Sequence, residues 1–249
     1  MFRPNILAYL TQYGIRPNFP VTLVENSQAI YPGERGRTEY LFESSQNKII
    51  GVKIHFADSV SETVLVHELG HLKLRCLGLP VLGVPPDMPA LLVFFTIIHD
   101  EFYVRVAMDN FFPEVSIKHN DEEVNRIPSR QRLNLVVSSI PPYGTPMWYE
   151  GMISFALTAT IASVCSRSQN LSDRTARFQM PRSTARATSI QPYLDEICDA
   201  VDALPELPTN RGFSDEEKSL VIRSANRIIR KISNQRARPL EPTQYSIDC

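Results

Sequence analysis

The sequence has almost no net charge. Its 26 lysines and arginines balance 27 aspartates and glutamates, which leaves −1 over 249 residues at pH 7. The overall charge therefore does not indicate a nucleic acid or an anionic membrane as a partner. Long apolar runs are missing as well, because residues 89–98 and 151–166 fall short of the roughly 20 residues that cross a bilayer. We expect both runs to form buried core helices and expect no membrane partner.

Closely spaced cysteines are also absent. The four cysteines are scattered, so no Cys-x-x-Cys pair is available to bind a metal or to act as a redox couple. Cysteines in such a pattern (Cys76, Cys165, Cys198 and Cys249) predict reduced thiols in a cytoplasmic protein. Residues 1–17 contain proline and polar side chains where a signal peptide has an apolar stretch, so we expect them to belong to the mature fold.

Two strands and one helix are predicted near the N-terminus. Residues 21–26 form the first strand, and residues 47–57 form the second. In the second strand apolar residues alternate with others, as in an edge strand with one buried face: Ile50, Val52, Ile54 and Phe56. Ser59 and Glu62 form a capping box that starts a helix, and Gly78 with Pro80 supplies its end.

The rest of the chain is predicted to be mainly helical. Helices are expected at about residues 90–110 and 148–165, with loop-like sequence at 114–146 between them. Two amphipathic helices close the chain, and Ser214 with Glu217 forms a capping box ahead of the second. The predicted fold is α+β and mainly helical, with a small N-terminal sheet packed on the first long helix.

Four segments follow from this pattern. Residues 1–165 are expected to form the main domain, and residues 166–189 a flexible, arginine-rich surface loop. Residues 190–238 should form helices packed on the same domain, and residues 239–249 a tail. No internal repeat is present.

The stretch VLVHELGHLKL carries the clearest chemical signal. Residues four apart on a helix share a face, so His67 and His71 can bind one cation together. Glu68 lies one position on, beside that cation. Two neutral imidazoles bind Zn²⁺ in the HExxH metalloproteases, and the glutamate takes a proton from a water that the metal activates. The alternative is an amphipathic core helix whose two histidines have no metal.

Zinc at a catalytic site needs a third protein ligand. Glu150 is one candidate, because it is the only acid at the start of an otherwise uncharged helix and a buried carboxylate needs a positive partner. His99 and Asp100 are two others, with apolar neighbours at helical spacing, as a ligand or as a residue that orients one. Glu101 should instead pair with Arg105 on the solvated face. Tyr103 and Tyr149 are weaker candidates for stabilising a tetrahedral intermediate.

Two resemblances follow from these residues. HELGH with the later glutamate in WYEGMIS resembles the gluzincin metallopeptidases, which implies a zincin-like fold with His67, His71 and Glu150 as ligands and Glu68 as general base. Residues 47–113, in which a strand leads into HELGH and a later helix ends in VAMDNFFP, are similar to the ImmA/IrrE-type metallopeptidases. These are bacterial regulatory proteases, and the similarity places Asp100 near the ligand position.

The predicted function is that of a zinc metallopeptidase, an endopeptidase of narrow specificity that cleaves a protein or peptide, with a regulatory protein as one target class. The substrate would lie along the strand at Ile50 to Phe56. One alternative is a catalytically inactive protein of the same fold that acts as a binding or regulatory module. A less favoured alternative is nucleic-acid binding through the arginine-rich loop and the last helix (Arg223, Arg227, Arg230 and Lys231).

Overall fold

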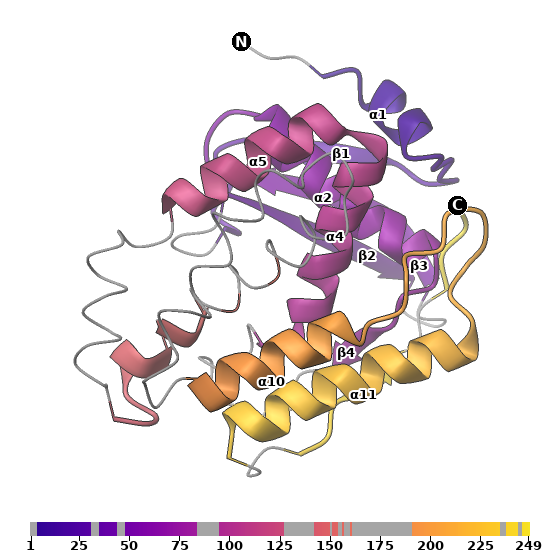
Figure 1. Cartoon of the computed structure of the whole chain (residues 1–249). Coiled ribbons are helices and arrows are strands. Elements are labelled where there is room, and N and C mark those ends of the chain that lie inside the picture. The colour runs from indigo at the N-terminus through magenta and orange to yellow at the C-terminus, as the bar shows by residue number, and fades with distance from the viewer. Residues whose placement is uncertain are drawn as a thin grey trace.

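A computed structural model of the chain shows an α+β fold of which about half is helical, with two small sheets (Figure 1). The structure describes residues 4–30, 35–43, 48–83, 95–126, 142–149, 151–153, 156, 160, 191–234, 238–243 and 246–249. The α+β class predicted from the sequence is confirmed. The predicted loop at 166–189 lies outside the described residues.

The larger sheet has three strands in the order β1-β3-β2. β1 (Val21–Val24) runs parallel to β3 (Lys48–Phe56), and β2 (Gly36–Glu43) runs antiparallel to it. The two predicted strands are confirmed, but the prediction that β3 is an edge strand is wrong. The sequence pattern did not reveal β2. This strand pairs with the side of β3 that faces away from β1, and it takes the edge position.

A bulge in β3 changes which residues are buried. Leu41 pairs with Gly51 and Phe42 pairs with Ile49, so Ile50 is left without a partner across the ladder. Ile50 is therefore 47% exposed, whereas Ile49 is 2% exposed. The predicted burial of Ile50 is wrong, because an extra residue in one strand reverses the alternation on one side of the bulge. The other predicted core positions of β3 are buried: Val52, Ile54 and Phe56.

Helix α2 (Glu62–Cys76) contains the HELGH motif and packs against β2 and β3. It begins at the N-cap Ser61, whose side chain makes no capping bond, so the predicted Ser59–Glu62 capping box is wrong. Glu62 instead accepts a hydrogen bond of 2.7 Å from the Tyr9 hydroxyl. The helix ends as predicted, since Gly78 has a φ of 74°, which is the conformation that ends helices and favours glycine.

Two helices cover α2 on the side away from the sheet. α4 (Ile98–Phe111) packs along it, and α5 (Pro113–Arg126) crosses both (Figure 1). The predicted loop over residues 114–146 is therefore wrong for its first part. Pro113 fits the first turn of α5, because that turn's N–H groups have no helical partner. The described residues between 146 and 160 are helical, in agreement with the helix predicted there.

The two predicted C-terminal helices are present as α10 (Gln191–Asp202) and α11 (Asp215–Ile232), and they lie side by side (Figure 1). The capping box before α11 is confirmed: Glu217 N–H donates to Ser214 Oγ at 3.2 Å, and Ser214 N–H donates to the Glu217 carboxylate at 2.7 Å. The segment that connects the two helices is hydrogen-bonded to the N-terminal part of the fold. Phe213 N–H donates to Leu77 O at 2.7 Å, and Tyr103 donates to Pro205 O at 2.8 Å.

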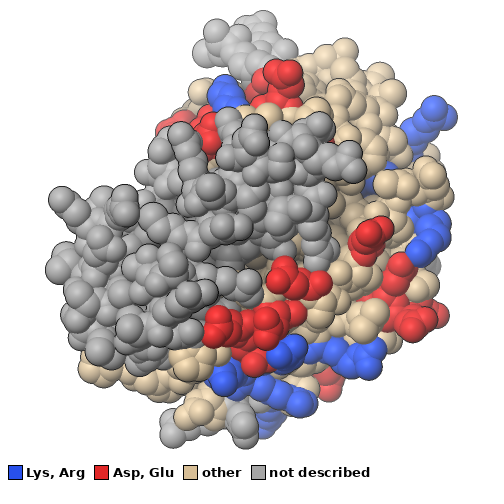
Figure 2. All heavy atoms as spheres, in the orientation of Figure 1, with Lys and Arg blue, Asp and Glu red and all other residues tan. Residues whose placement is uncertain are grey.

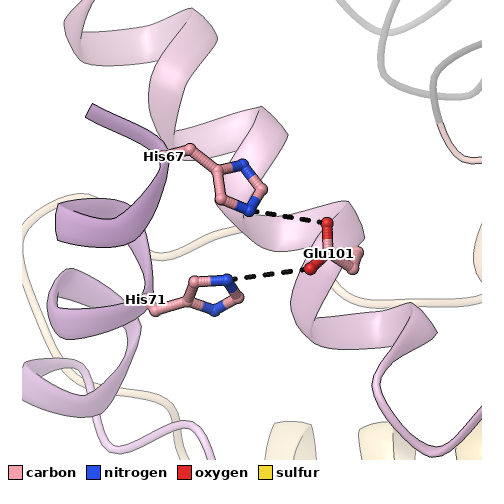
Figure 3. Close-up of side chains that lie close together, drawn as sticks. All are labelled: His67, His71 and Glu101. Carbon is pink, nitrogen blue, oxygen red and sulfur yellow. Dashed lines mark ion pairs between the residues drawn. The ribbon is translucent and has the colours of Figure 1, made fainter. Parts of the chain in front are cut away.

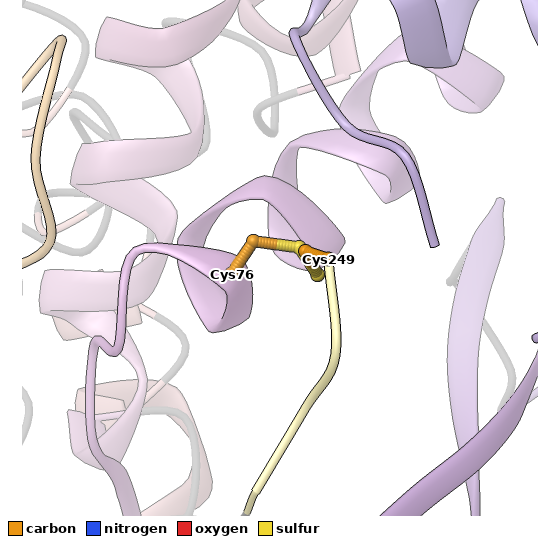
Figure 4. Close-up of a disulfide and its surroundings, with 2 residues drawn as sticks. All are labelled: Cys76 and Cys249. Atoms are coloured by element: carbon orange, nitrogen blue, oxygen red, sulfur yellow. A yellow bond between two sulfur atoms is a disulfide. The ribbon is translucent and has the colours of Figure 1, made fainter. Parts of the chain in front are cut away.

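The last residues are packed and do not form a separate tail. β5 (Glu241–Thr243) pairs antiparallel with β4 (Val81–Gly83). Cys249 forms a disulfide with Cys76 at the end of α2, so the predicted reduced state is wrong for these two cysteines (Figure 4). The two are 173 residues apart, which is why spacing alone did not reveal the bond. Among the described segments, no helix combines the length and apolarity that a bilayer crossing requires.

The capping box gives a direct stability test. Ser214→Ala removes the acceptor for the Glu217 N–H, so we expect the free energy of unfolding to fall by about 1 kcal/mol. Urea unfolding followed by circular dichroism measures this loss. Ser219→Ala in the same helix is the control, because its hydroxyl only donates to Asp215 O within the helix. Equal losses in both variants would show that the cap contributes nothing specific.

Candidate metal centre

Three side chains from two helices converge on one point (Figure 3). His67 and His71 project from α2, one turn apart, and Glu101 faces them from α4. One potential ligand atom from each lies within 4.8 Å of the others. His67 Nε2 is 3.7 Å from one carboxylate oxygen of Glu101, and His71 Nε2 is 3.7 Å from the other. This set of two imidazoles and one carboxylate is a known zinc-ligand set that keeps a fourth position open.

Glu101 was expected on a solvated face, and that prediction is wrong. Its side chain is 14% exposed, and that of Arg105 is 1% exposed. The predicted pairing with Arg105 does exist, at 3.7 Å, but it is buried. The reason is α5, whose Asn120 accepts a hydrogen bond of 3.0 Å from Arg105. Because α5 was expected to be a loop, the stripe that it covers seemed to face solvent.

The Glu101 carboxylate is held ionised. Burial raises its pKa, but the charges of His67, His71 and Arg105 outweigh burial and lower the pKa to about 2. Its ion pairs with these three residues are all 3.7 Å long, which exceeds the 2.7–3.2 Å of a direct N–H···O hydrogen bond. A cation between Glu101 and the two imidazoles would give this buried charge shorter contacts.

Asp100 supports the site from behind. It accepts a hydrogen bond of 2.9 Å from His71 Nδ1 and forms an ion pair with Arg75. Burial raises the pKa of Asp100, but Arg75 and His71 hold it far below the usual range for a carboxyl. Because this hydrogen bond turns Nδ1 of the His71 ring toward Asp100, the other ring nitrogen, Nε2, faces Glu101. This is the ligand-orienting position that the sequence offered as one possibility for Asp100.

The surroundings of His71 favour its protonated form. Burial lowers its pKa, but the hydrogen bond to Asp100 and the charges of Asp100, Glu68 and Glu101 outweigh burial and raise the pKa to about 9. A metal ligand must be a neutral imidazole at the binding nitrogen. Metal binding at neutral pH therefore has to displace a proton from His71.

The Glu68 carboxylate contacts β2 and is not one of the three converging groups. It is 5% exposed, and Thr38 donates to its Oε2 at 2.8 Å. Gly36 lies against the same side chain, since a Cβ there would be 2.8 Å from Glu68 Oε1 and 2.3 Å from Val64 Cγ1. Only glycine leaves room for this close approach. β2 thus fixes the carboxylate beside the metal ligands without making it one of them.

His119 supports His67 from α5. The two rings stack with centroids 4.8 Å apart and an interplanar angle of 29°. His67 Nδ1 is buried and has no hydrogen-bond partner among the described residues, so ring stacking takes the place of the hydrogen bond that orients His71. Sequence reasoning missed His119, Thr38 and Gly36, because it did not reveal the elements that carry them, α5 and β2.

The other predicted site residues stand apart from this group. His99 is 4% exposed, and burial lowers its pKa to about 4. Within the described residues it does not join the converging set, which consists of His67, His71 and Glu101. Tyr103 donates to Pro205 O at 2.8 Å, and Tyr149 contacts the Trp148 ring. Glu150 lies outside the described residues.

No family model matches the chain, and neither the curated proteins nor the solved structures include a significant match. The chemistry of the site therefore has to be judged from the side chains themselves. They provide two imidazoles, an ionised carboxylate and a buried carboxylate next to them.

The pKa of His71 leads to a pH test. Because that pKa is about 9, zinc binding at pH 7.5 should release about one proton from this residue, and the apparent affinity should rise about tenfold per pH unit up to pH 9. Titration calorimetry in buffers of different ionisation enthalpy counts the protons. Asp100→Asn removes the main group that raises the pKa, so proton release at pH 7.5 should fall. A wild-type protein that releases no proton would contradict the assigned state of His71.

Proposed function

We propose that the chain is a zinc-dependent endopeptidase of narrow specificity with a zincin-like fold. The observation that carries this proposal is the convergence of His67, His71 and Glu101, with Glu68 buried beside them and excluded from the ligand set. HELGH alone supplies two ligands and a base. The adjacent helix α4 offers the third ligand that a catalytic zinc site requires.

Each residue has a distinct role in this proposal. His67, His71 and Glu101 would hold zinc, which when bound supplies a Lewis acid that polarises the scissile carbonyl and makes a water more acidic. Glu68 accepts the proton of the attacking water and passes it to the leaving amine. Thr38 holds the Glu68 carboxylate in place, and Asp100 keeps His71 Nε2 turned toward the site.

The substrate would bind along β2. Because β3 is paired on both sides, it cannot accept the additional strand that the sequence suggested. β2 lies at the edge of the described sheet and already contacts Glu68 through Thr38. An extended peptide paired with β2 would gain backbone hydrogen bonds next to the base. The resemblance to regulatory metallopeptidases favours a regulatory protein as the target.

The disulfide bears on the cellular location. A cytoplasmic location was predicted from reduced thiols, and the Cys76–Cys249 disulfide removes that argument. Stable disulfides are typical of oxidising compartments. A disulfide that forms and breaks reversibly would also be compatible with a reducing compartment.

Nucleic-acid binding has little support on the described surface. Arg227 of α11 pairs with Glu196 and lies 3.9 Å from Asp199, both on α10. Figure 2 shows basic groups along the lower edge of the molecule beside acidic ones, and α10 and α11 lie at that edge in Figure 1. Interspersed charges of opposite sign do not form the continuous basic surface that binds phosphates.

Metal content tests the ligand set. We expect about one zinc per wild-type chain by elemental analysis after excess metal is removed. Glu101→Gln should lose it, with a loss of affinity beyond the roughly 10–100-fold that removal of a supporting residue costs. Glu114→Gln, an exposed position on α5, is the matched control. Retention of zinc in Glu101→Gln together with its loss in Glu150→Gln would move the third ligand to Glu150.

Hydrolysis tests the base. Glu68→Gln should bind zinc as the wild type does but lose cleavage by about 100- to 10,000-fold, because the amide cannot accept the proton. A proteome-derived peptide library with mass-spectrometric identification of new internal ends measures cleavage without a known substrate. The zinc-loaded wild type could make no cuts, or only cuts that Glu68→Gln also makes. In either case the metal is structural and the peptidase proposal is wrong.

A further inference from the structure

The disulfide joins the helix that carries the metal ligands to the last residues of the chain. Cys76 is the final residue of α2, and its Cα is 5.7 Å from that of Cys249 (Figure 4). Cys249 is exposed and Cys76 is partly exposed, so a reductant can reach the bond from solvent. Breaking the bond requires no rearrangement of the core.

A short series of contacts connects Cys76 to the metal site. Arg75, the preceding residue, is buried, and it both pairs with Asp100 and donates to Leu79 O at 2.8 Å. Asp100 in turn accepts the hydrogen bond from His71 Nδ1 at 2.9 Å. The last turn of α2 therefore carries, in adjacent residues, the disulfide and the guanidinium that holds the partner of His71.

Among the described residues, a small set of further contacts holds residues 246–249, and it includes Ile247, which is partly buried and packs against the hydrophobic core. Lys48 pairs with Asp248 at 2.6 Å, but the two side chains are 37% and 51% exposed, and exposed pairs contribute little. Two backbone hydrogen bonds add to it, from Ile49 N–H to Ser246 O at 2.9 Å and from Asn18 N–H to Asp248 O at 3.3 Å. The disulfide is the one covalent link that holds this segment against α2.

We propose that the Cys76–Cys249 bond is a thiol-sensitive latch that sets the metal affinity of the His67–His71–Glu101 site. Reduction by a dithiol breaks the S–S bond, and two protein thiols form while the dithiol becomes a disulfide. Residues 246–249 then leave α2, and its last turn loses one of its anchors while the Phe213–Leu77 hydrogen bond remains. Ends of helices without such anchors open locally, which here moves Arg75 and weakens its hold on Asp100. The proposal concerns regulation of the proposed zinc site and rests on it.

The first measurement compares zinc affinity in the two redox states of the whole chain. Competition with a chromophoric chelator gives the Kd of the oxidised protein and of protein reduced by a phosphine, which becomes the phosphine oxide as water supplies the oxygen. We expect the reduced form to bind zinc about 10- to 100-fold more weakly, as when a residue that orients a ligand is lost. Hydrogen exchange on the same samples should show faster exchange at residues 246–249 and at the end of α2.

Variants separate the latch from general effects of reduction. Cys249→Ser should bind zinc as weakly as the reduced wild type, whereas Cys198→Ser should keep the full redox response. In Arg75→Lys, which cannot reproduce both hydrogen bonds of the guanidinium, reduction should change affinity less than in the wild type. Circular dichroism checks the fold of each. Should Cys249→Ser fail to fold, the oxidised and reduced wild type still give the comparison.

The outcomes distinguish the latch from the zinc site. Equal zinc affinity in both redox states would overturn the latch and leave the proposed site intact. Absence of zinc binding in both states would overturn the site and the latch together. A loss of affinity on reduction that persists in full in Arg75→Lys would overturn the route through Asp100.

Discussion

Two adjacent carboxylates on α4 need positive partners, most of which α2 supplies, and the arrangement of the site depends on this requirement. Asp100 is buried against the HELGH helix, and Glu101 is largely buried there, with 14% of its side chain exposed. An unpaired charge in such surroundings costs several kcal/mol. Asp100 has close partners in Arg75 and His71. Among the residues that the structure describes, Glu101 has ion pairs of 3.7 Å alone, with His67, His71 and Arg105. The difference leaves Glu101 as the carboxylate that a cation would satisfy.

The sequence predicted the helix face of the site but not its third member. His67, Glu68 and His71 follow from local spacing, because a helix places residues four apart on one face. The same spacing argument gave the wrong surroundings for Glu101, because an ion pair with Arg105 four residues on is typical of a solvated helix face. This face is buried because α5 packs over it. The spacing of residues within one helix does not predict which other helix packs against it.

Long-range pairing explains the other differences. β2 determines that β3 is central and fixes the bulge at Ile50, yet neither effect is local to β3. The Cys76–Cys249 bond spans 173 residues and has no motif. Where a local signal was sufficient, as in the capping box at Ser214 or the glycine that ends α2, prediction and structure agree.

The edge strand β2 joins two parts of the proposed chemistry. Thr38 holds the Glu68 carboxylate, and Gly36 allows that carboxylate to lie directly against the strand. β2 is also an edge strand of the described sheet. A peptide that pairs with β2 would therefore contact the element that fixes the base. Because the strand is held on its other side by the β3 ladder, the position of the base would not depend on whether a peptide is bound, and the energy of binding could be used to place the scissile bond.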